Sequence, residues 1–251
     1  MKRIKLTVAY DGTNYCGWQI QDNGITIEEV LNRELSKLLQ EDIKIIGASR
    51  TDSGVHALGN VAVFDTQTRI PPEKISFALN QRLPDDIRIQ ESCQVADDFH
   101  PRFCDTIKTY EYRIWNDKFP NPLVRLYSKF CYFHVDIAKM GIGRNIEQAA
   151  AYLVGEHDFK SFCTPRTQVE STVRTVTEIS FRTEGKMIIM TIRGTGFLYN
   201  MVRIIMGTLL KCGMNMYPPE HVKEILDAKD RAAAGPKAEA CGLQLVGIEY
   251  L

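Results

Sequence analysis

Residues 47–57 form a polar loop, GASRTDSGVHA, which lies between two apolar segments and is bracketed by glycines. Loops held by a rigid scaffold are where catalytic and binding side chains concentrate. Asp52 follows Arg50 by two residues, and a neighbouring guanidinium keeps a carboxylate ionised. Asp52 is therefore a candidate catalytic acid. The same pattern also fits a turn whose aspartate caps a short helix and whose arginine is solvated.

Two tyrosines and one arginine are the other candidates for chemistry. Tyr110 and Tyr112 share one face of a predicted strand, where packing in the core is the commoner role of an aromatic ring. Arg203 lies inside an apolar helical segment, MVRIIM, where an arginine is rarely buried without a partner. We therefore expect a carboxylate beside Arg203. The histidines lack the spacing of metal ligands, so no metal site is predicted.

The first half of the chain must position the Asp52 loop, and its pattern is β-α-β-β-α-β. Thr26 and Glu29 form a capping box at the start of a helix with apolar residues at helical spacing. A second helix is expected from Pro71 to Gln81. Strands are predicted from alternation at 4–8, 43–48, 60–64 and 87–93. This order is the split βαβ arrangement of ferredoxin-like folds.

The second half repeats this pattern approximately. Strands are predicted at 108–115 and 128–135, a hairpin at 173–182 and 187–193, and a last strand at 243–250; helices are predicted at 136–153, 197–212 and 218–228. We predict an α+β protein of two ferredoxin-like halves, residues 1–100 and 101–251. Their antiparallel sheets are expected to join, with a central active-site cleft.

The composition of the 251 residues is ordinary for a globular protein, with 44% hydrophobic and 25% charged residues. Seven cysteines without a CxxC pair favour reduced thiols, and neither a signal peptide nor a membrane span is evident, so a cytoplasmic protein is expected. Residues 100–211 carry 16 Lys and Arg against 10 Asp and Glu, which is compatible with one cationic face along phosphates.

The residue patterns resemble one known family along the whole chain. Residues 50–57, RTDSGVHA, closely resemble the signature GRTDAGVHA of the TruA family of tRNA pseudouridine synthases. Further matches in the same order are YDGTNYCGWQ at 10–19, DFHPRF at 98–103, TYEY at 109–112, GEHDF at 155–159, MVRIIMG at 201–207 and ACGLQL at 240–245. Ser49 and Ser53 depart from the usual Gly and Ala, but they flank Asp52 and do not replace it.

The resemblance implies an isomerase that breaks the N1–C1′ bond of a uridine, rotates the base and rejoins it through C5. Such a reaction needs a carboxylate beside C1′ and no cofactor. By resemblance, Asp52 is the nucleophile, although abstraction of the C2′ proton to give a glycal is equally open. Arg203 is assigned to pairing with Asp52.

The other site residues also follow from the resemblance. Arg50 is assigned to RNA phosphate or to the displaced neighbouring base. Tyr110 is expected to stack on the extruded uracil, and its hydroxyl is a candidate for removing the C5 proton. Phe197 and Leu198 are expected to wall the uracil pocket.

The resemblance further implies a tRNA substrate, modified at uridines 38, 39 and 40 of the anticodon stem and loop, and a homodimer. Recognition of three different sequence contexts must rest on backbone shape and charge. The candidate phosphate contacts are Arg102, Lys108, Arg113, Arg125, Lys129, Arg166 and Arg174. Two rival classes are a glycosidase, which normally needs a second carboxylate near Asp52, and a non-catalytic RNA-binding module, which has no need of Asp52.

Overall fold

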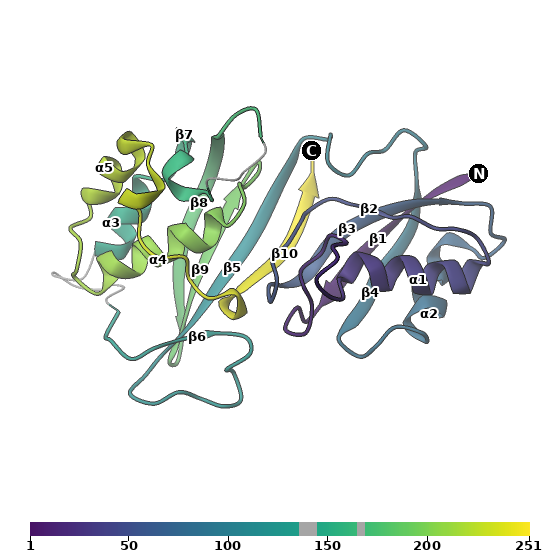
Figure 1. Ribbon diagram of the computed structural model, residues 1–251, viewed down its shortest axis with the longest axis horizontal. Helices are drawn as coiled ribbons and strands as arrows, with labels where there is room; N and C mark the ends of the chain where they lie inside the picture. The colour runs from purple at the N-terminus through teal and green to yellow at the C-terminus, as the bar shows by residue number, and fades with distance from the viewer. Residues whose placement is uncertain (136–144, 165–168) are drawn as a thin grey trace. The chain divides into compact units, whose positions relative to one another are not determined.

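The computed structural model describes residues 1–135, 145–164 and 169–251, which form two compact units (Figure 1). The first unit comprises Met1–Thr106 and Gln244–Leu251, and the second comprises Ile107–Leu243. Each unit combines strands and helices, as the predicted α+β class requires. No helix among the described residues is long and apolar enough to cross a membrane.

The sheet of the first unit has the strand order β4-β1-β3-β10, with β2 beside β3. Its strands are β1 (Lys2–Tyr10), β2 (Ile46–Gly47), β3 (His56–Thr66), β4 (Ile87–Val95) and β10 (Leu243–Tyr250). β1 pairs antiparallel with both β3 and β4. Alternate residues of β1 are buried, because successive side chains of a strand point to opposite faces.

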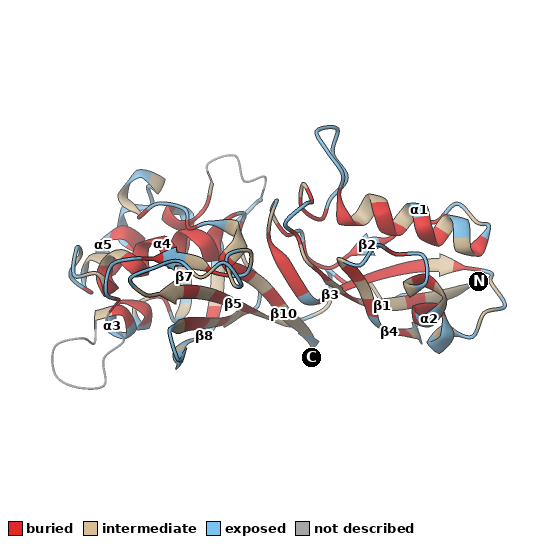
Figure 2. Ribbon diagram, turned by 90° about the horizontal axis from the view of Figure 1, so that it is seen from below, coloured by how far each residue is buried: buried red, intermediate tan, exposed pale blue. Residues whose placement is uncertain are grey.

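Two helices pack with this sheet. Helix α1 (Ile27–Leu39) begins at Thr26, whose Oγ1 accepts a hydrogen bond from the backbone N–H of Glu29 at 3.3 Å, so the predicted start is confirmed. Its buried residues, most of them apolar, form a stripe, and its remaining residues are half-buried or exposed (Figure 2). A 3₁₀ turn (Pro72–Lys74) leads into α2 (Ile75–Asn80), which packs on β4.

Some predicted strands of the first unit have different lengths in the structure. The strand expected at 43–48 is reduced to the two residues of β2. The strand expected at 60–64 instead begins at His56, inside the candidate catalytic loop. The last strand groups with this unit and not with the second half, because β10 pairs in parallel with β3 through Gln244 opposite His56. The compact units therefore differ from the halves 1–100 and 101–251 at the seam and in this strand.

The sheet of the second unit has the order β5-β9-β8-β7, with β6 beside β5. Its strands are β5 (Thr106–Asn116), β6 (Lys129–Cys131), β7 (Gly155–Asp158), β8 (Val173–Glu184) and β9 (Met187–Gly194). The predicted hairpin of β8 and β9 is confirmed. The helices are α3 (Asn145–Ala151), α4 (Met201–Gly213) and α5 (His221–Ala228). All residues of α4 except Lys211 are buried, so this helix forms the centre of the unit's core (Figure 2).

Three elements of the second unit differ from the prediction. The strand expected at 128–135 is only the three-residue β6. It ends at Cys131 because the side-chain amide of Asn116 donates hydrogen bonds to the carbonyls of Cys131 and Phe133, at 2.9 and 2.7 Å. Strand β7 was not predicted. The helix expected from 197 begins at Met201, since Asn200 has a left-handed backbone with φ 62°. The predicted helix start at Asp136 lies outside the described residues.

Candidate active site

The loop that carries Asp52 connects β2 to β3 in the first unit. Thr51 is buried, Asp52 is half-buried and Arg50 is exposed. The backbone N–H of Val55 donates to the carbonyl of Asp52 at 3.1 Å, which closes a tight turn around the carboxylate. The turn exposes one side of the aspartate while its backbone is held from within the unit.

The segment 10–19 holds this loop through its backbone. The N–H of Trp18 donates to the carbonyl of Thr51 at 3.1 Å, directly before Asp52. The carbonyl of Tyr15 accepts from the N–H of Gly54 at 3.4 Å and from the Ser53 hydroxyl at 3.1 Å, directly after it. The two peptide segments therefore clamp Asp52 on both sides. We call residues 10–19 the clamp segment.

Glycines permit this close approach. Gly17 has φ +89°, and a Cβ there would lie 2.6 Å from the carbonyl oxygen of Thr51. A Cβ on Gly12 would lie 2.0 Å from the carbonyl oxygen of Val55. Both contacts are far inside van der Waals distance, so the glycines of the motif YDGTNYCGWQ allow the clamp segment to lie on the Asp52 loop.

Side chains complete the support. The hydroxyls of Tyr10 and Thr51 form a hydrogen bond of 2.7 Å, and the N–H of Gly12 donates to Nδ1 of His56 at 3.1 Å. The indole of Trp18 is fully buried above Gly47. His56 therefore supports the clamp segment by a hydrogen bond, and the buried Trp18 anchors this segment beside the loop.

Arg102 lies at the same loop, which the sequence did not indicate. Its Nε donates to the carbonyl of Gly47 at 2.6 Å. The residue as a whole is exposed, yet desolvation by the surrounding chain, and then the like charge of Arg50, lowers the pKa of Arg102. Arginine side chains stay charged in proteins. Two cations therefore lie at the loop that carries Asp52: Arg50 on the loop itself, and Arg102, which is bound to the carbonyl of Gly47.

The second unit brings together two of the aromatic candidates. Tyr110 on β5 is 8% exposed and lies opposite Ile192 of β9. Its ring meets the ring of Phe197 edge to face, with centroids 5.3 Å apart. Leu198 beside it is buried and Phe197 is half-buried. This cluster forms one apolar corner of the second unit.

Tyr112 has the core role that the strand pattern favours. It is fully buried, its hydroxyl donates to the carbonyl of Glu239 at 2.8 Å, and burial raises its pKa. Its ring also lies against Gly242, where a Cβ would approach it to 2.7 Å. Tyr112 therefore holds the chain segment that precedes β10.

Arg203 is buried in α4, with 9% of its surface exposed. Its Nε donates to the carbonyl of Ala238 at 2.8 Å, and its Nη1 donates to Oδ1 of Asn200 at 3.2 Å. Asn200 was not among the predicted site residues; an asparagine directly before an apolar helix was its sequence signal. Asp52 belongs to the first unit and Arg203 to the second, and their pairing stays a prediction.

The predicted phosphate contacts are in varied environments. Lys129 pairs with Glu239 at 2.6 Å, and Arg113 pairs with Glu111 at 3.3 Å. Arg125 is exposed, while Lys108 and Arg174 are half-buried, and desolvation lowers the pKa of Arg174. Arg166 lies outside the described residues. Among the described residues, neither Arg125 nor Arg174 forms an ion pair with an acidic side chain. These two arginines are therefore better placed than Arg113 to meet phosphate.

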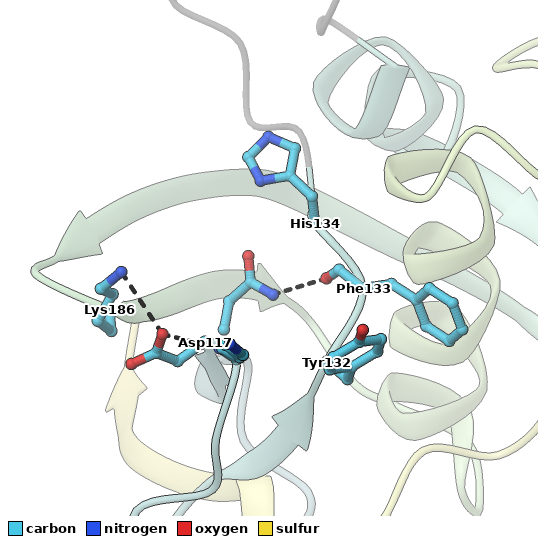
Figure 3. Close-up of a pocket in the computed structure, with 7 residues that line it drawn as sticks. Asp117, Tyr132, Phe133, His134 and Lys186 are labelled. Atoms are coloured by element: carbon cyan, nitrogen blue, oxygen red, sulfur yellow. Dashed lines mark hydrogen bonds and ion pairs between the residues drawn. The ribbon is translucent and has the colours of Figure 1, made fainter.

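A hollow of about 480 Å³ lies elsewhere in the second unit and contains none of the predicted site residues. Figure 3 shows Lys186 turned toward Asp117 across it, at 3.5 Å. Its lining is Asn116, Asp117, Lys118, Tyr132, Phe133, His134 and Lys186. Its chemistry is mixed, with aromatic rings and charges of both signs, so it offers no carboxylate centre comparable to the Asp52 loop.

Comparison with known proteins assigns the class. A family model described as tRNA pseudouridine synthase matches residues 6–104 and 149–251. The chain is 43% identical over 250 residues to a tRNA pseudouridine synthase A of Acetivibrio thermocellus. It is 44% identical over 250 residues to tRNA pseudouridine synthase A 2 of Clostridium perfringens, and 45% identical over 251 residues to tRNA pseudouridine synthase A of Ruminiclostridium cellulolyticum. Each match covers all of both chains.

An α+β protein with a clamped aspartate loop and these relatives is an RNA-modifying isomerase. The chain belongs to the tRNA pseudouridine synthase family. Its reaction is the isomerisation of uridine in tRNA to pseudouridine.

Proposed function

We propose that this isomerase modifies uridines 38, 39 and 40 of the tRNA anticodon stem and loop, with Asp52 as its nucleophile. The observation that carries the proposal is the clamp around Asp52. Hydrogen bonds from Trp18 and to Tyr15 fix the peptides before and after it, while the carboxylate stays half-buried. A carboxylate held in this way needs little reorganisation before it attacks a sugar carbon.

The proposed reaction conserves every atom of the substrate. The N1–C1′ bond breaks, and the carboxylate oxygen of Asp52 forms an ester at C1′; by the alternative route it takes the C2′ proton and leaves a glycal. The detached uracil rotates and C5 bonds to C1′ as the bond between Asp52 and C1′ breaks; in the glycal route, the proton returns from Asp52 to C2′ as C5 bonds to C1′. The C5 proton then leaves as N1 gains one. Substrate and product are isomers, so the step calls for no oxidant, reductant or group donor.

The other residues have supporting roles in this proposal. Arg203 pairs with Asp52 and favours its ionised form. Tyr110 stacks on the uracil and its hydroxyl helps to remove the C5 proton, while Phe197 and Leu198 wall the pocket. The contact between the rings of Tyr110 and Phe197 supports a common apolar wall. Arg50, exposed on the Asp52 loop, meets an RNA phosphate or the displaced neighbouring base.

Binding of tRNA is proposed to rest on charge and backbone shape, through Arg102, Lys108, Arg113, Arg125, Lys129, Arg166 and Arg174. The position of Arg102 beside the Asp52 loop supports a phosphate contact next to the reacting nucleotide. We also propose a homodimer in which one subunit holds tRNA while the other modifies it. A cytoplasmic location follows from the proposed substrate.

Replacing Asp52 tests the proposal. Asp52→Asn keeps the shape of the side chain but removes the nucleophilic charge, so pseudouridine formation on tRNA should stop while tRNA binding stays within a few-fold. Pseudouridine is read by carbodiimide labelling and primer extension. Asp85→Asn is the matched control, because Asp85 is a solvent-exposed aspartate of the same unit, paired only with Arg88. Conversion by Asp52→Asn at a rate like that of the control rejects Asp52 as the nucleophile.

A further inference from the structure

Asn200 occupies the residue before α4 in an unusual way. Its backbone is left-handed, with φ 62° and ψ 5°, and its side chain makes no capping hydrogen bond to the helix. An asparagine at this position ordinarily accepts the N–H of the second or third helical residue. Here the amide is directed elsewhere. A strained residue that gives up a local stabilising bond is a signal of function.

The amide of Asn200 links Arg203 to a separate segment. Its Oδ1 accepts from Nη1 of Arg203 at 3.2 Å, and its Nδ2 donates to Oγ1 of Thr164 at 2.8 Å. Asn200 is 7% exposed, so little water competes for these bonds. Since one amide group makes both bonds, it cannot rotate without breaking one of them. The acceptor that Arg203 meets is therefore fixed in direction.

A second acceptor fixes the other side of the guanidinium. Nε of Arg203 donates to the carbonyl of Ala238 at 2.8 Å, and the N–H of Ala238 donates back to the carbonyl of Arg203 at 3.0 Å. Residues 235–239, which we call the strap, are themselves tied down. Gly235 donates to Oγ1 of Thr208 at 2.9 Å, and Tyr112 donates to the carbonyl of Glu239 at 2.8 Å.

The strap lies directly on α4. A Cβ on Gly207 would come within 1.7 Å of the carbonyl oxygen of Pro236, so only glycine allows this approach. The Ala238 carbonyl is thus held at a set height above the helix that carries Arg203. The planar guanidinium is therefore held at two of its nitrogens, at Nε by the strap and at Nη1 by Asn200.

Both acceptors are neutral. They orient the guanidinium without neutralising its charge. We infer that Asn200 is a positioning residue that, with the Ala238 carbonyl, sets the plane of Arg203 for its carboxylate partner in the reaction. This inference rests on the proposed function, in which that partner is Asp52.

The inference also explains why asparagine stands here. Only Gly, Asn and Asp occupy the left-handed region readily. Glycine offers no acceptor. Aspartate offers a charged acceptor, which would pair with Arg203 and compete with Asp52. Asparagine combines a ready left-handed backbone with a short side chain that is both a neutral acceptor and a donor.

Asn200→Gly is the central test, because it keeps the backbone conformation and removes only the amide. We expect kcat for pseudouridine formation to fall about 10- to 100-fold, as for the loss of other partners that orient an active-site group, with KM for tRNA changed less than about 3-fold. The matched control is Asn215→Gly. Asn215 is also left-handed, with φ 58°, but its side chain meets Asn145. The kcat of Asn215→Gly should equal that of the unaltered chain.

Two more variants separate the possible outcomes. Asn200→Asp keeps an acceptor but adds a charge, and should lower kcat at least as much as Asn200→Gly. In an Arg203→Lys background, Asn200→Gly should lower kcat by less than about a further 3-fold, because its effect passes through the guanidinium.

Full activity of Asn200→Gly, together with a large loss in Arg203→Lys, overturns the inference and leaves the proposed function standing. Full activity of Arg203→Lys rejects instead the role of Arg203 in the proposed function. An equal loss of kcat in Asn215→Gly attributes the effect to the glycine and overturns the inference. If Asn200→Gly does not fold, Asn200→Asp decides: an unaltered kcat there overturns the inference.

Discussion

The backbone N–H of Trp18 donates to the carbonyl oxygen of Thr51 at 3.1 Å, so the clamp segment holds the peptide that leads into Asp52. Gly17, directly before Trp18 in the clamp segment, has a left-handed backbone that turns the chain toward the loop. Two motifs that are more than thirty residues apart in the sequence thus form one structural unit. The clamp makes the position of Asp52 depend on residues of a distant motif.

Gly17→Ala should therefore impair both folding and catalysis. The new Cβ would lie 2.6 Å from the Thr51 carbonyl and force φ +89° on a residue with a side chain. We expect a loss of about 1–3 kcal/mol in unfolding free energy and a lower single-turnover rate at temperatures where the variant is folded. Both are measured on the purified protein by denaturant titration and rapid quench.

Gly185→Ala is the matched control. Gly185 also has positive φ, at +61°, but a Cβ there meets nothing within 4 Å. It should cost about 1–2 kcal/mol of stability and leave the single-turnover rate unaltered. A Gly17→Ala enzyme with an unaltered rate would show that the clamp does not position Asp52.

Removal of the hydroxyl should affect protein stability differently at Ser49 and at Ser53. Ser49 is 4% exposed, and its Oγ has no hydrogen-bond partner among the described residues. Ser49→Ala should leave stability unchanged or raise it by up to about 1 kcal/mol, since a buried unpaired hydroxyl costs free energy. Ser53→Ala loses the bond to Tyr15 and should cost about 0.5–1 kcal/mol. Unfolding midpoints in denaturant compare the two; a clear loss in Ser49→Ala would contradict the geometry.

Tyr110→Phe should separate stacking from proton transfer. The phenylalanine ring keeps the contact with Phe197 and a face for uracil, so tRNA affinity should stay within about 3-fold. Loss of the hydroxyl should lower kcat about 10²-fold or more if this hydroxyl helps to remove the C5 proton. Release of tritium from [5-³H]uridine-labelled tRNA measures that step. Tyr110→Ala should in addition weaken binding by about 1–3 kcal/mol through lost stacking. Equal tritium release by Tyr110→Phe and the unaltered enzyme removes the hydroxyl from the mechanism.

Arg125→Gln and Arg174→Gln should each reduce the salt dependence of tRNA binding. Each lost phosphate contact lowers the slope of log K against log salt by about 0.7–0.9. Arg33→Gln is the control, because Arg33 pairs with Glu34 on α1. Filter binding across a salt series gives the slopes. A slope identical to that of the control would exclude the arginine in question from the phosphate contacts.

Much of the local structure was predictable from the sequence. Alternation in β1, the Thr26 cap of α1 and the Glu184-Gly185 hairpin are short-range patterns, in which nearby residues determine the backbone. β6 and β7 were not predicted correctly because their pairing depends on distant partners. The Asn116 side chain ends β6, and β7 exists only beside β8.

For the site, the sequence alone indicated Asp52 as a candidate, since a glycine-bracketed RTD loop is a contiguous signal. It also indicated Arg203, a cation in an apolar helix. Only the tertiary structure showed what holds them. Trp18 and Tyr15 grip the Asp52 loop from more than thirty residues away, and Ala238 meets Arg203 from 35 residues along the chain. In each of these contacts at least one partner is a backbone group, which every residue carries, so the sequence does not show which residue supplies it. They arise only when the folded sheet and helix bring the two segments within hydrogen-bond distance.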